Sequence, residues 1–256
     1  MKGTLSRELF EALLNNKEEG FQSILFQNRR GFSTLLQCRH CGWIPGCNNC
    51  DISLTYHKYS SELKCHYCGY KEKTPSKCPL CGSHDLSYKG FGTEQVEEDL
   101  SMFFEDVESL RLDQDSTKTK DAFQKIITAF ENGEADILLG TQMVTKGLDF
   151  ERVNLVGILN ADLLFNFPDF RAAERSFQLI TQVSGRAGRR RHQGKVLIQT
   201  YNPKNQIFNL LKDNNYLDFY KNEMIERKQF QYPPYYRLIK ITVKHGTLNT
   251  VKNAAF

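Results

Sequence analysis

The stretch ADILLGTQMVTKGLDFERVNLVGIL (residues 135–159) contains two apolar runs, ILLG and VNLVGIL, with a mostly polar segment between them. Runs of this length and composition are typical of strands that are buried on both faces of a sheet. Helical spacing predicts a helix on either side, over residues 118–131 and 172–183, and KVLIQTY (residues 195–201) predicts a further strand. Strands that alternate with helices of about 10 to 15 residues indicate an α/β fold, a parallel sheet with helices on both faces.

The flanking sequence extends the same pattern. Apolar residues recur at helical spacing over residues 6–19, where Ser6 is a candidate N-cap and Gly20 a candidate stop. A short buried strand is predicted at residues 24–26, a helix at 93–104 and a strand at 107–112. From residue 202 the chain is predicted to be helical, and then extended after YPPYY (residues 232–236).

The overall charge and hydropathy exclude two classes of protein. The 256 residues carry a formal net charge of +4, so the chain is not a polycation, and any basic surface must come from local clustering. No apolar stretch approaches the roughly 20 residues that a membrane span needs, and the first 14 residues do not resemble a signal peptide. We therefore expect a cytoplasmic protein with no membrane partner.

All eight cysteines fall between residues 38 and 81, in four C-x-x-C pairs: CRHC, CNNC, CHYC and CPLC. With no sign of secretion, thiolate–metal chemistry is favoured over disulfides. A C-x-x-C turn directs two thiolates at one tetrahedral ion, so four pairs supply two complete zinc sites. Such closed sites leave no open position for water, which predicts two structural Zn²⁺ ions rather than a catalytic one.

The spacing favours a nested arrangement of the four pairs. The long loop between the second and third pairs suits a two-knuckle ribbon, with an inner cluster of Cys47, Cys50, Cys65 and Cys68 and an outer cluster of Cys38, Cys41, Cys78 and Cys81. A crossed arrangement, in which the first pair joins the third and the second joins the fourth, stays open. So does replacement of a thiolate by a histidine, for which the candidates are His40, His66 and His84.

A glycine follows three of the four pairs, at Gly42, Gly69 and Gly82, where the missing Cβ lets backbone N–H groups turn towards the sulfurs. Asp51 takes this place after the CNNC pair, so we expect that turn to be held less tightly.

The stretch QVSGRAGRRRHQGKV (residues 182–196) has arginines at positions 186, 189, 190 and 191, with glycines at 185 and 188. Planar guanidinium groups bind phosphate oxygens bidentately. A solvated basic face would account for Arg190, Arg191 and Lys195. It does not account for the glycines.

The pattern Q-x-x-G-R-x-G-R at residues 182–189 resembles motif VI of superfamily 2 helicases, and residues 138–189 resemble motifs V and VI in order. ILFQNRRGF (residues 24–32) resembles motif IV. The eight cysteines that follow it are similar to the insertion of the PriA-type replication restart helicases, also called primosomal protein N′. The resemblance extends from Leu5 through YPPYYRL (residues 232–238), and it favours the nested zinc ligands.

The resemblance implies four segments in the chain. Residues 1–36 and 85–201 would form the second RecA-like helicase lobe, residues 37–84 a zinc-binding insertion (the cysteine module), and residues 202–256 the start of a truncated C-terminal domain.

The same resemblance implies a nucleotide site. Arg186 and Arg189 would be arginine fingers that stabilise charge on the transferring phosphoryl group, and Gln182 would support the phosphates. Gly147 and Asp149, in KGLDF, match residues that sense nucleotide at the interface between the lobes. For Asp149, a role as an N-cap or turn residue remains the alternative.

For DNA, the resemblance implies that Thr141 and Gln142 face the phosphate backbone. Phe165, Phe167 and Phe170 could stack on single-stranded bases, although aromatic residues between a strand and a helix are more often part of a core. Arg29 and Arg30, in the motif IV stretch, could contact DNA or lie in a solvated turn.

No G-x-x-x-x-G-K-[ST] and no D-E-x-H occurs in the chain. The resemblance places these elements on a first lobe, which would share ATP and Mg²⁺ with this one. We therefore expect a C-terminal helicase-lobe fragment that is inactive alone and that belongs to an ATP-dependent DNA helicase acting in replication restart and primosome assembly. Its expected partners are forked or single-stranded DNA, ATP, and other primosome and single-strand-binding proteins. The alternative is a non-catalytic, zinc-dependent module that binds DNA or protein.

Overall fold

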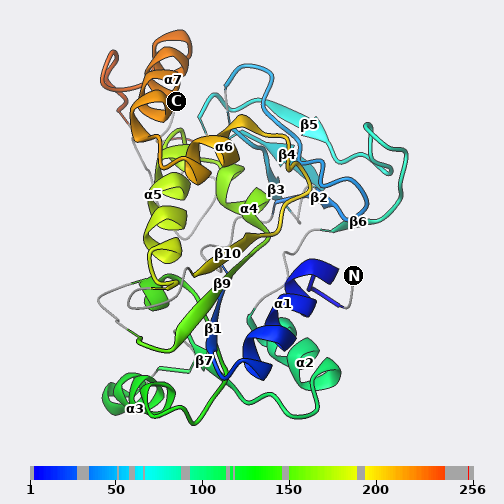
Figure 1. Ribbon diagram of the computed structural model, residues 1–256. Helices are drawn as coiled ribbons and strands as arrows, with labels where there is room; N and C mark the ends of the chain where they lie inside the picture. The colour runs from blue at the N-terminus through cyan, green and yellow to red at the C-terminus, as the bar shows by residue number, and fades with distance from the viewer. Residues whose placement is uncertain are drawn as a thin grey trace.

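The computed structural model describes residues 3–27, 35–50, 52–57, 61–65, 67–87, 93–113, 116–117, 119–145, 150–188, 194–239 and 253. At its centre lies a five-stranded sheet in the order β10-β9-β1-β8-β7, in which every neighbouring pair is parallel (Figure 1). Its strands are β1 (Gln22–Gln27), β7 (Ser109–Leu112), β8 (Ile137–Gly140), β9 (Val153–Leu159) and β10 (Lys195–Ile198). The predicted parallel α/β fold is confirmed.

The middle strand β1 is buried along its whole length. Its side chains alternate between the two faces, so that Ile24 and Phe26 join one core cluster and Leu25 joins the other. Its polar first residue is satisfied internally, because the Gln22 side-chain amide donates to the carbonyls of Phe130 and Ala135, each at 2.7 Å. The buried Gln22 side chain therefore has partners for its amide N–H groups and carries no desolvation penalty from unpaired donors.

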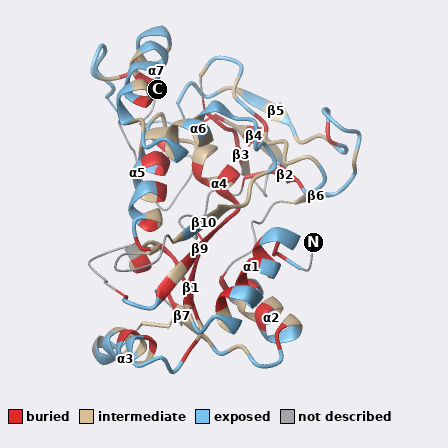
Figure 2. Ribbon diagram, viewed as in Figure 1, coloured by how far each residue is buried: buried red, intermediate tan, exposed pale blue. Residues whose placement is uncertain are grey.

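Helices cover both faces of the sheet. Helices α1 (Arg7–Glu18) and α2 (Thr93–Phe103) pack on the Leu25 face, while α3 (Lys120–Glu131), α4 (Ala161–Phe165) and α5 (Ala172–Ser184) pack on the other. In Figure 2 buried residues (red) and exposed residues (pale blue) alternate along these helices, as expected for helices that cover a sheet with one face. At the start of α1 the Ser6 hydroxyl accepts a hydrogen bond from the Leu9 N–H at 3.2 Å, as the sequence predicts for an N-cap.

The cysteine module leaves the sheet at the carboxyl end of β1 and returns at α2. Its two ends pair with each other, because β2 (Gln37–Cys38) and β6 (Leu86–Ser87) form a short antiparallel ladder with Gln37 opposite Ser87. Between them β3 (Thr55–His57), β4 (Glu62–Lys64) and β5 (Lys71–Lys73) form a separate antiparallel sheet. A small core lies within the module, made of Leu36, Ile52, Leu54, Leu63 and Cys65.

Two further helices, α6 (Gln206–Lys212) and α7 (Tyr216–Gln229), follow β10. Phe219 of α7 stacks on Phe177 of α5 at a ring distance of 4.3 Å, and Arg227 Nη2 lies 2.7 Å from Glu174 Oε2. The region after the YPPYY stretch, predicted to be extended, is described only to residue 239 and at residue 253. None of the helices in the described part of the chain is long and apolar enough to cross a membrane.

Two short elements, α4 and the 3₁₀-helix η1 (Gln142–Thr145), were absent from the sequence prediction. Neither is long enough to show a helical period, so their formation depends on tertiary packing. Ala161 and Leu164 of α4 and Val144 of η1 are all buried in the same core cluster.

We predict that residues 38–86 can be replaced by a linker of three or four small residues without unfolding the rest of the chain. Gln37 and Ser87, which remain, are paired and lie about 5 Å apart, so a short linker spans them without strain. Circular dichroism and thermal unfolding of the deletion variant should show a cooperative fold. A variant without helical signal would mean that the module belongs to the core of the larger unit.

We also predict that Glu174→Gln destabilises the protein by about 2 kcal/mol at pH 7. Arg171 first, and then Arg227, hold the pKa of Glu174 at about 2 against the opposing effect of burial. A depressed pKa contributes stability that is present above the pKa of the unfolded state, roughly 4.3, and lost as the pH falls towards 2.

Urea unfolding from pH 7 to pH 3 should therefore show the difference between the two proteins narrowing below about pH 4.3. The matched control is Glu11→Gln, because Glu11 pairs with Arg7 on the exposed face of α1 and should change stability little at any pH. A constant difference for Glu174→Gln across this range would contradict the assignment.

Candidate metal centres and arginine segment

The eight cysteines form two clusters of four. One contains Cys38, Cys41, Cys78 and Cys81, and the other Cys47, Cys50, Cys65 and Cys68; within each, the sulfurs all lie within 4.8 Å of one another. These are the predicted outer and inner clusters. The nested arrangement is confirmed and the crossed one is wrong. Among the described residues, no histidine belongs to either cluster.

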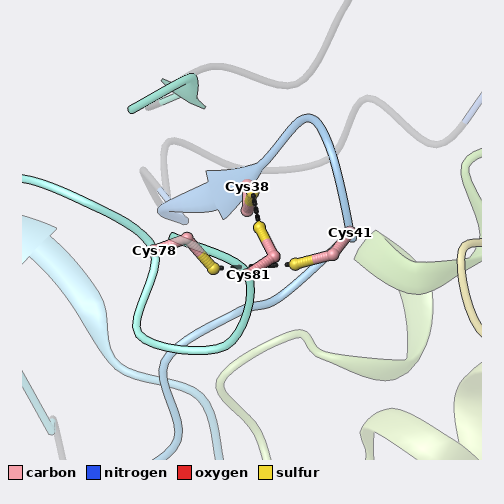
Figure 3. Close-up of side chains that lie close together, drawn as sticks. All are labelled: Cys38, Cys41, Cys78 and Cys81. Carbon is pink, nitrogen blue, oxygen red and sulfur yellow. Dashed lines mark hydrogen bonds between the residues drawn. The ribbon is translucent and has the colours of Figure 1, made fainter. Parts of the chain in front are cut away.

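The sulfur separations fit a tetrahedral ion. In the outer cluster Cys38 Sγ lies 3.6 Å from Cys81 Sγ, and Cys41 Sγ lies 3.6 Å from Cys78 Sγ (Figure 3). In the inner cluster Cys47 Sγ lies 3.5 Å from Cys68 Sγ. Four sulfurs at about 2.3 Å from a central zinc ion would be separated by roughly 3.8 Å. Donor type, number and spacing therefore all fit structural zinc.

All four C-x-x-C turns close in the same way. The N–H of the first cysteine donates to the carbonyl five residues later, in the pairs Cys38–Trp43 (2.9 Å), Cys47–Ile52 (2.8 Å), Cys65–Tyr70 (2.8 Å) and Cys78–Ser83 (2.8 Å). Gly42, Gly69 and Gly82 adopt φ of +75° to +76°, a conformation that suits glycine. Asp51 lies outside the described residues, so the looser turn expected there stays a prediction, although the Cys47–Ile52 bond is as short as its counterparts.

Backbone N–H groups and burial act on the thiols in opposite directions. The pKa of Cys68 is lowered to about 6, chiefly by the N–H of Tyr70. Burial raises the pKa of Cys41 to about 12. For Cys78, burial is opposed by the N–H groups of Cys81 and Leu80, and the pKa falls to about 7. Because some thiols keep their protons until a metal arrives, metal binding releases protons and weakens as the pH falls.

The arginine segment begins at the end of α5. Gln182 is exposed on its last turn, and Arg186, with only 9% of its surface exposed, follows two residues after the helix. The Gly188 N–H donates to the carbonyl of Val153, the first residue of β9, at 3.1 Å. The segment therefore lies at the amino edge of the sheet, the end at which the parallel strands begin. Of the other predicted nucleotide-site residues, Arg189, Gly147 and Asp149 lie outside the described residues, as do Arg190 and Arg191.

Gly188 and Gly194 have a steric role in this segment. Gly188 has φ of +71°, and a Cβ at Gly194 would lie 2.3 Å from the Ala187 carbonyl carbon. The chain that leaves Arg186 and the chain that returns to β10 thus approach each other more closely than side chains allow. At Gly185 a Cβ would meet only ordinary van der Waals contacts, so the structure gives that glycine no steric role.

The residues predicted to contact DNA lie at the opposite edge of the sheet. Thr141 directly follows β8, its N–H donates to the Leu112 carbonyl at 3.3 Å, and 9% of its surface is exposed. Gln142 begins η1 and is partly exposed. The cysteine module lies at this carboxyl edge too, because Asn160 Nδ2 donates to Gln37 Oε1 at 3.3 Å.

The aromatic residues after β9 make contacts within the fold. Phe165 meets Phe208 edge-on at 5.6 Å, and Phe170 stacks on Tyr232 at 5.0 Å. These contacts favour the core interpretation for both rings. Arg29 and Arg30, together with His66, lie outside the described residues.

Sequence reasoning missed Asp162, which fixes the end of β10. The buried carboxylate accepts hydrogen bonds from the Thr200 hydroxyl and the Tyr201 N–H, both at 3.0 Å. Tyr201 in turn packs on Gly42 of the outer cluster. The sequence did offer a signal, because Asn160 and Asp162 directly follow the buried run of β9. Polar residues at the carboxyl end of a parallel strand often position a site.

Two family descriptions match the chain. The PriA DNA helicase Cys-rich region domain matches residues 47–73, which contain the inner cluster, and the helicase conserved C-terminal domain matches residues 91–191, which contain Thr141, Gln142 and Arg186. The outer cysteine pairs flank the first match on both sides.

Curated relatives carry the name "Replication restart protein PriA". That of Bacillus subtilis (strain 168) is 49% identical over 244 residues, that of Synechocystis sp. 46% over 242 residues, and that of Treponema pallidum (strain Nichols) 42% over 252 residues. These alignments cover 95%, 93% and 98% of this chain, but 30%, 29% and 38% of the respective relatives. The chain therefore spans between 29% and 38% of the length of these relatives.

We predict that the purified chain binds two zinc ions, and that paired cysteine variants reveal which sulfurs share an ion. Cys38→Ala with Cys81→Ala removes two ligands of the outer cluster and should leave about one zinc ion per chain. Cys38→Ala with Cys65→Ala damages both clusters and should leave close to none. Metal analysis after dialysis measures both. The reverse ranking would indicate the crossed arrangement.

Proposed function

This chain belongs to the PriA family of replication restart proteins, and on that premise we propose that it is the second RecA-like lobe of an ATP-dependent DNA helicase that acts in replication restart and primosome assembly at forked DNA. One observation carries the proposal: two closed four-cysteine clusters are inserted at the carboxyl edge of a helicase-type parallel sheet whose α5 is followed by Arg186.

The proposed nucleotide site is divided between two lobes. Arg186 and Arg189, supported by Gln182, would approach the γ-phosphate of an ATP held with Mg²⁺ by a lobe that carries the Walker lysine. The bond between Gly188 and Val153, together with the close approach at Gly194, holds the backbone beside Arg186, which supports the proposal because an arginine finger needs a fixed backbone. Gly147 and Asp149 would report nucleotide occupancy at the same interface.

The proposed DNA contact lies at the carboxyl edge. Thr141 can offer its hydroxyl and Gln142 its side-chain amide to phosphate without reading bases, while the Thr141 N–H is already bonded to Leu112. The cysteine module stands at the same edge, so a strand that crosses Thr141 would pass close to it. Nucleotide and DNA would thus act on opposite edges of one rigid sheet.

The cysteine module is proposed to bind zinc and to act as a docking surface for DNA or for other primosome and single-strand-binding proteins. The module has a small core of its own and two closed four-cysteine clusters, so it can present a surface to a partner without support from the sheet. These features also favour the second candidate function, a non-catalytic binding module.

We propose the segment boundaries of the sequence analysis, residues 1–36, 37–84, 85–201 and 202–256, with one extension. The pairing of Leu86 with Cys38 and of Ser87 with Gln37 assigns residues up to 87 to the cysteine module.

In a longer protein that includes the Walker-bearing lobe, we predict that Arg186→Ala lowers kcat for DNA-stimulated ATP hydrolysis by roughly 10³-fold or more and changes nucleotide affinity little. An arginine finger stabilises the transition state more than the ground state. Steady-state kinetics and nucleotide titration separate the two effects. Arg190→Ala, outside the motif, is the control and should keep most of the activity.

This chain alone should hydrolyse ATP negligibly, since no Walker lysine faces the arginines. Turnover by the purified chain that disappears with Arg186→Ala would falsify the divided site. It would also contradict the binding-module alternative, because a non-catalytic module hydrolyses no ATP. Normal kcat for Arg186→Ala in the longer protein would favour the binding module.

A further inference from the structure

A tyrosine of the inner cluster contacts a surface built by distant parts of the chain. Tyr67 lies between Cys65 and Cys68, and its ring meets Tyr232 edge-on at 6.0 Å. Tyr232 is 6% exposed and stacks on Phe170 at 5.0 Å. We call each C-x-x-C turn a knuckle. The Cys65–Cys68 knuckle, which supplies two of the four inner sulfurs, therefore packs on Phe170 of the α4–α5 connection and Tyr232 of the segment after α7.

That receiving surface is held by contacts that do not involve the cysteine module. The Tyr232 N–H donates to the Arg227 carbonyl at 2.7 Å, and the Arg227 guanidinium lies 5.4 Å from the centre of the Phe170 ring. The same guanidinium is 2.7 Å from Glu174 Oε2. Burial of Tyr67 against this surface raises the pKa of its hydroxyl, and the charge of Asp169 raises it further.

The outer cluster has a counterpart in Tyr201. Gly42 follows the first outer cysteine pair, and a Cβ there would lie 2.2 Å from Tyr201 Cβ and 2.4 Å from its Cγ, so the tyrosine packs directly on the glycine backbone. Its own N–H is held by Asp162 at 3.0 Å. At the other two knuckle glycines, Gly69 and Gly82, nothing lies within 4 Å of such a Cβ. Each cluster thus has one cysteine turn that contacts a tyrosine from outside the module, Tyr232 for the inner cluster and Tyr201 for the outer.

We propose that Tyr232 and Tyr201 are positioning residues for the two metal clusters, Tyr232 for the inner and Tyr201 for the outer, so that zinc retention and docking of the cysteine module are linked. For an ion to leave, its knuckle must open, and opening separates the knuckle from its tyrosine. Because opening must also break this contact, a docked tyrosine slows the loss of zinc. By the reciprocity of linked equilibria it also strengthens zinc binding, and loss of zinc loosens the docked segment. Residues behind the ligands of metal sites commonly change affinity by about 10- to 100-fold.

This inference rests on the proposed zinc loading, and it assigns separate consequences to the two clusters. Loss of the inner ion should free the segment after α7. Loss of the outer ion should free the chain that leaves β10 at Tyr201. The two segments are far apart in sequence and are joined to the module at different knuckles, so each can be tested without the other.

The test compares zinc release from the zinc-loaded chain and its variants after addition of a chromogenic chelator. Alkylation of freed cysteines, mapped by mass spectrometry, tells which cluster has opened. Tyr232→Ala should release inner zinc about 10-fold faster than the unchanged chain and leave outer release as it was. Tyr201→Ala should do the reverse. Tyr232→Phe and Tyr201→Phe keep the ring contacts and should behave like the unchanged chain.

The matched control is Tyr220→Ala, because Tyr220 is a half-exposed ring on α7 that lies 6.4 Å from the Tyr216 ring. It should alter neither rate. Circular dichroism monitors folding of each variant. If Tyr232→Ala fails to fold, Tyr67→Ala removes the same contact from the exposed side of the interface and should give the same selective release.

Equal release from both clusters in all variants, or equal acceleration of both clusters by either alanine variant, overturns the proposal. An unchanged chain that binds fewer than two zinc ions is a different failure, because it overturns the zinc assignment itself. Faster inner release with Tyr232→Ala and faster outer release with Tyr201→Ala support the linkage.

Discussion

The pairing of β1 with β9 on one side and β8 on the other is the constraint on which the other features depend. Ser23 of β1 is level with Ile137 of β8 and with Leu155 of β9, which sets the height of every strand end. From that register the carboxyl edge receives Thr141 and the entry to the cysteine module, and the amino edge receives Arg186. A shift of β1 by one residue would exchange its two apolar faces and separate both core clusters from their helices.

The cysteine module tolerates its position beside this central strand because its ends pair. An insertion of this length would otherwise cost loop-closure entropy and leave unpaired backbone at the sheet edge. The short ladder of β2 and β6 supplies partners for that backbone, and the small core around Leu54 and Leu63 is separate from the two large clusters. The two core clusters of the large sheet contain no residue of the cysteine module, so the sheet and its helices can fold without it.

Sequence alone predicted the elements whose patterns repeat. The buried runs of β8 and β9, the cap of α1 at Ser6 and the two cysteine clusters each follow from local spacing or from the number of thiolates that one ion accepts. What it could not predict depends on contacts between distant segments. The αL conformation of Asn160, the carboxylate of Asp162 that holds Thr200 and Tyr201, and the packing of Tyr201 on Gly42 have no periodic signature. The same holds for α4, whose five residues form a helix only because Ala161 and Leu164 are buried.

Arg186 and Thr141 lie at opposite ends of the strands of one sheet, so the sheet connects them mechanically. The seven residues of β9 separate the two edges, a length of about 20 Å at roughly 3.3 Å per residue. The strands between these edges are buried and close-packed, so the two edges cannot shift independently. A displacement of the backbone beside Arg186 therefore reaches the Thr141 edge as a movement of the whole sheet, with no hinge between them.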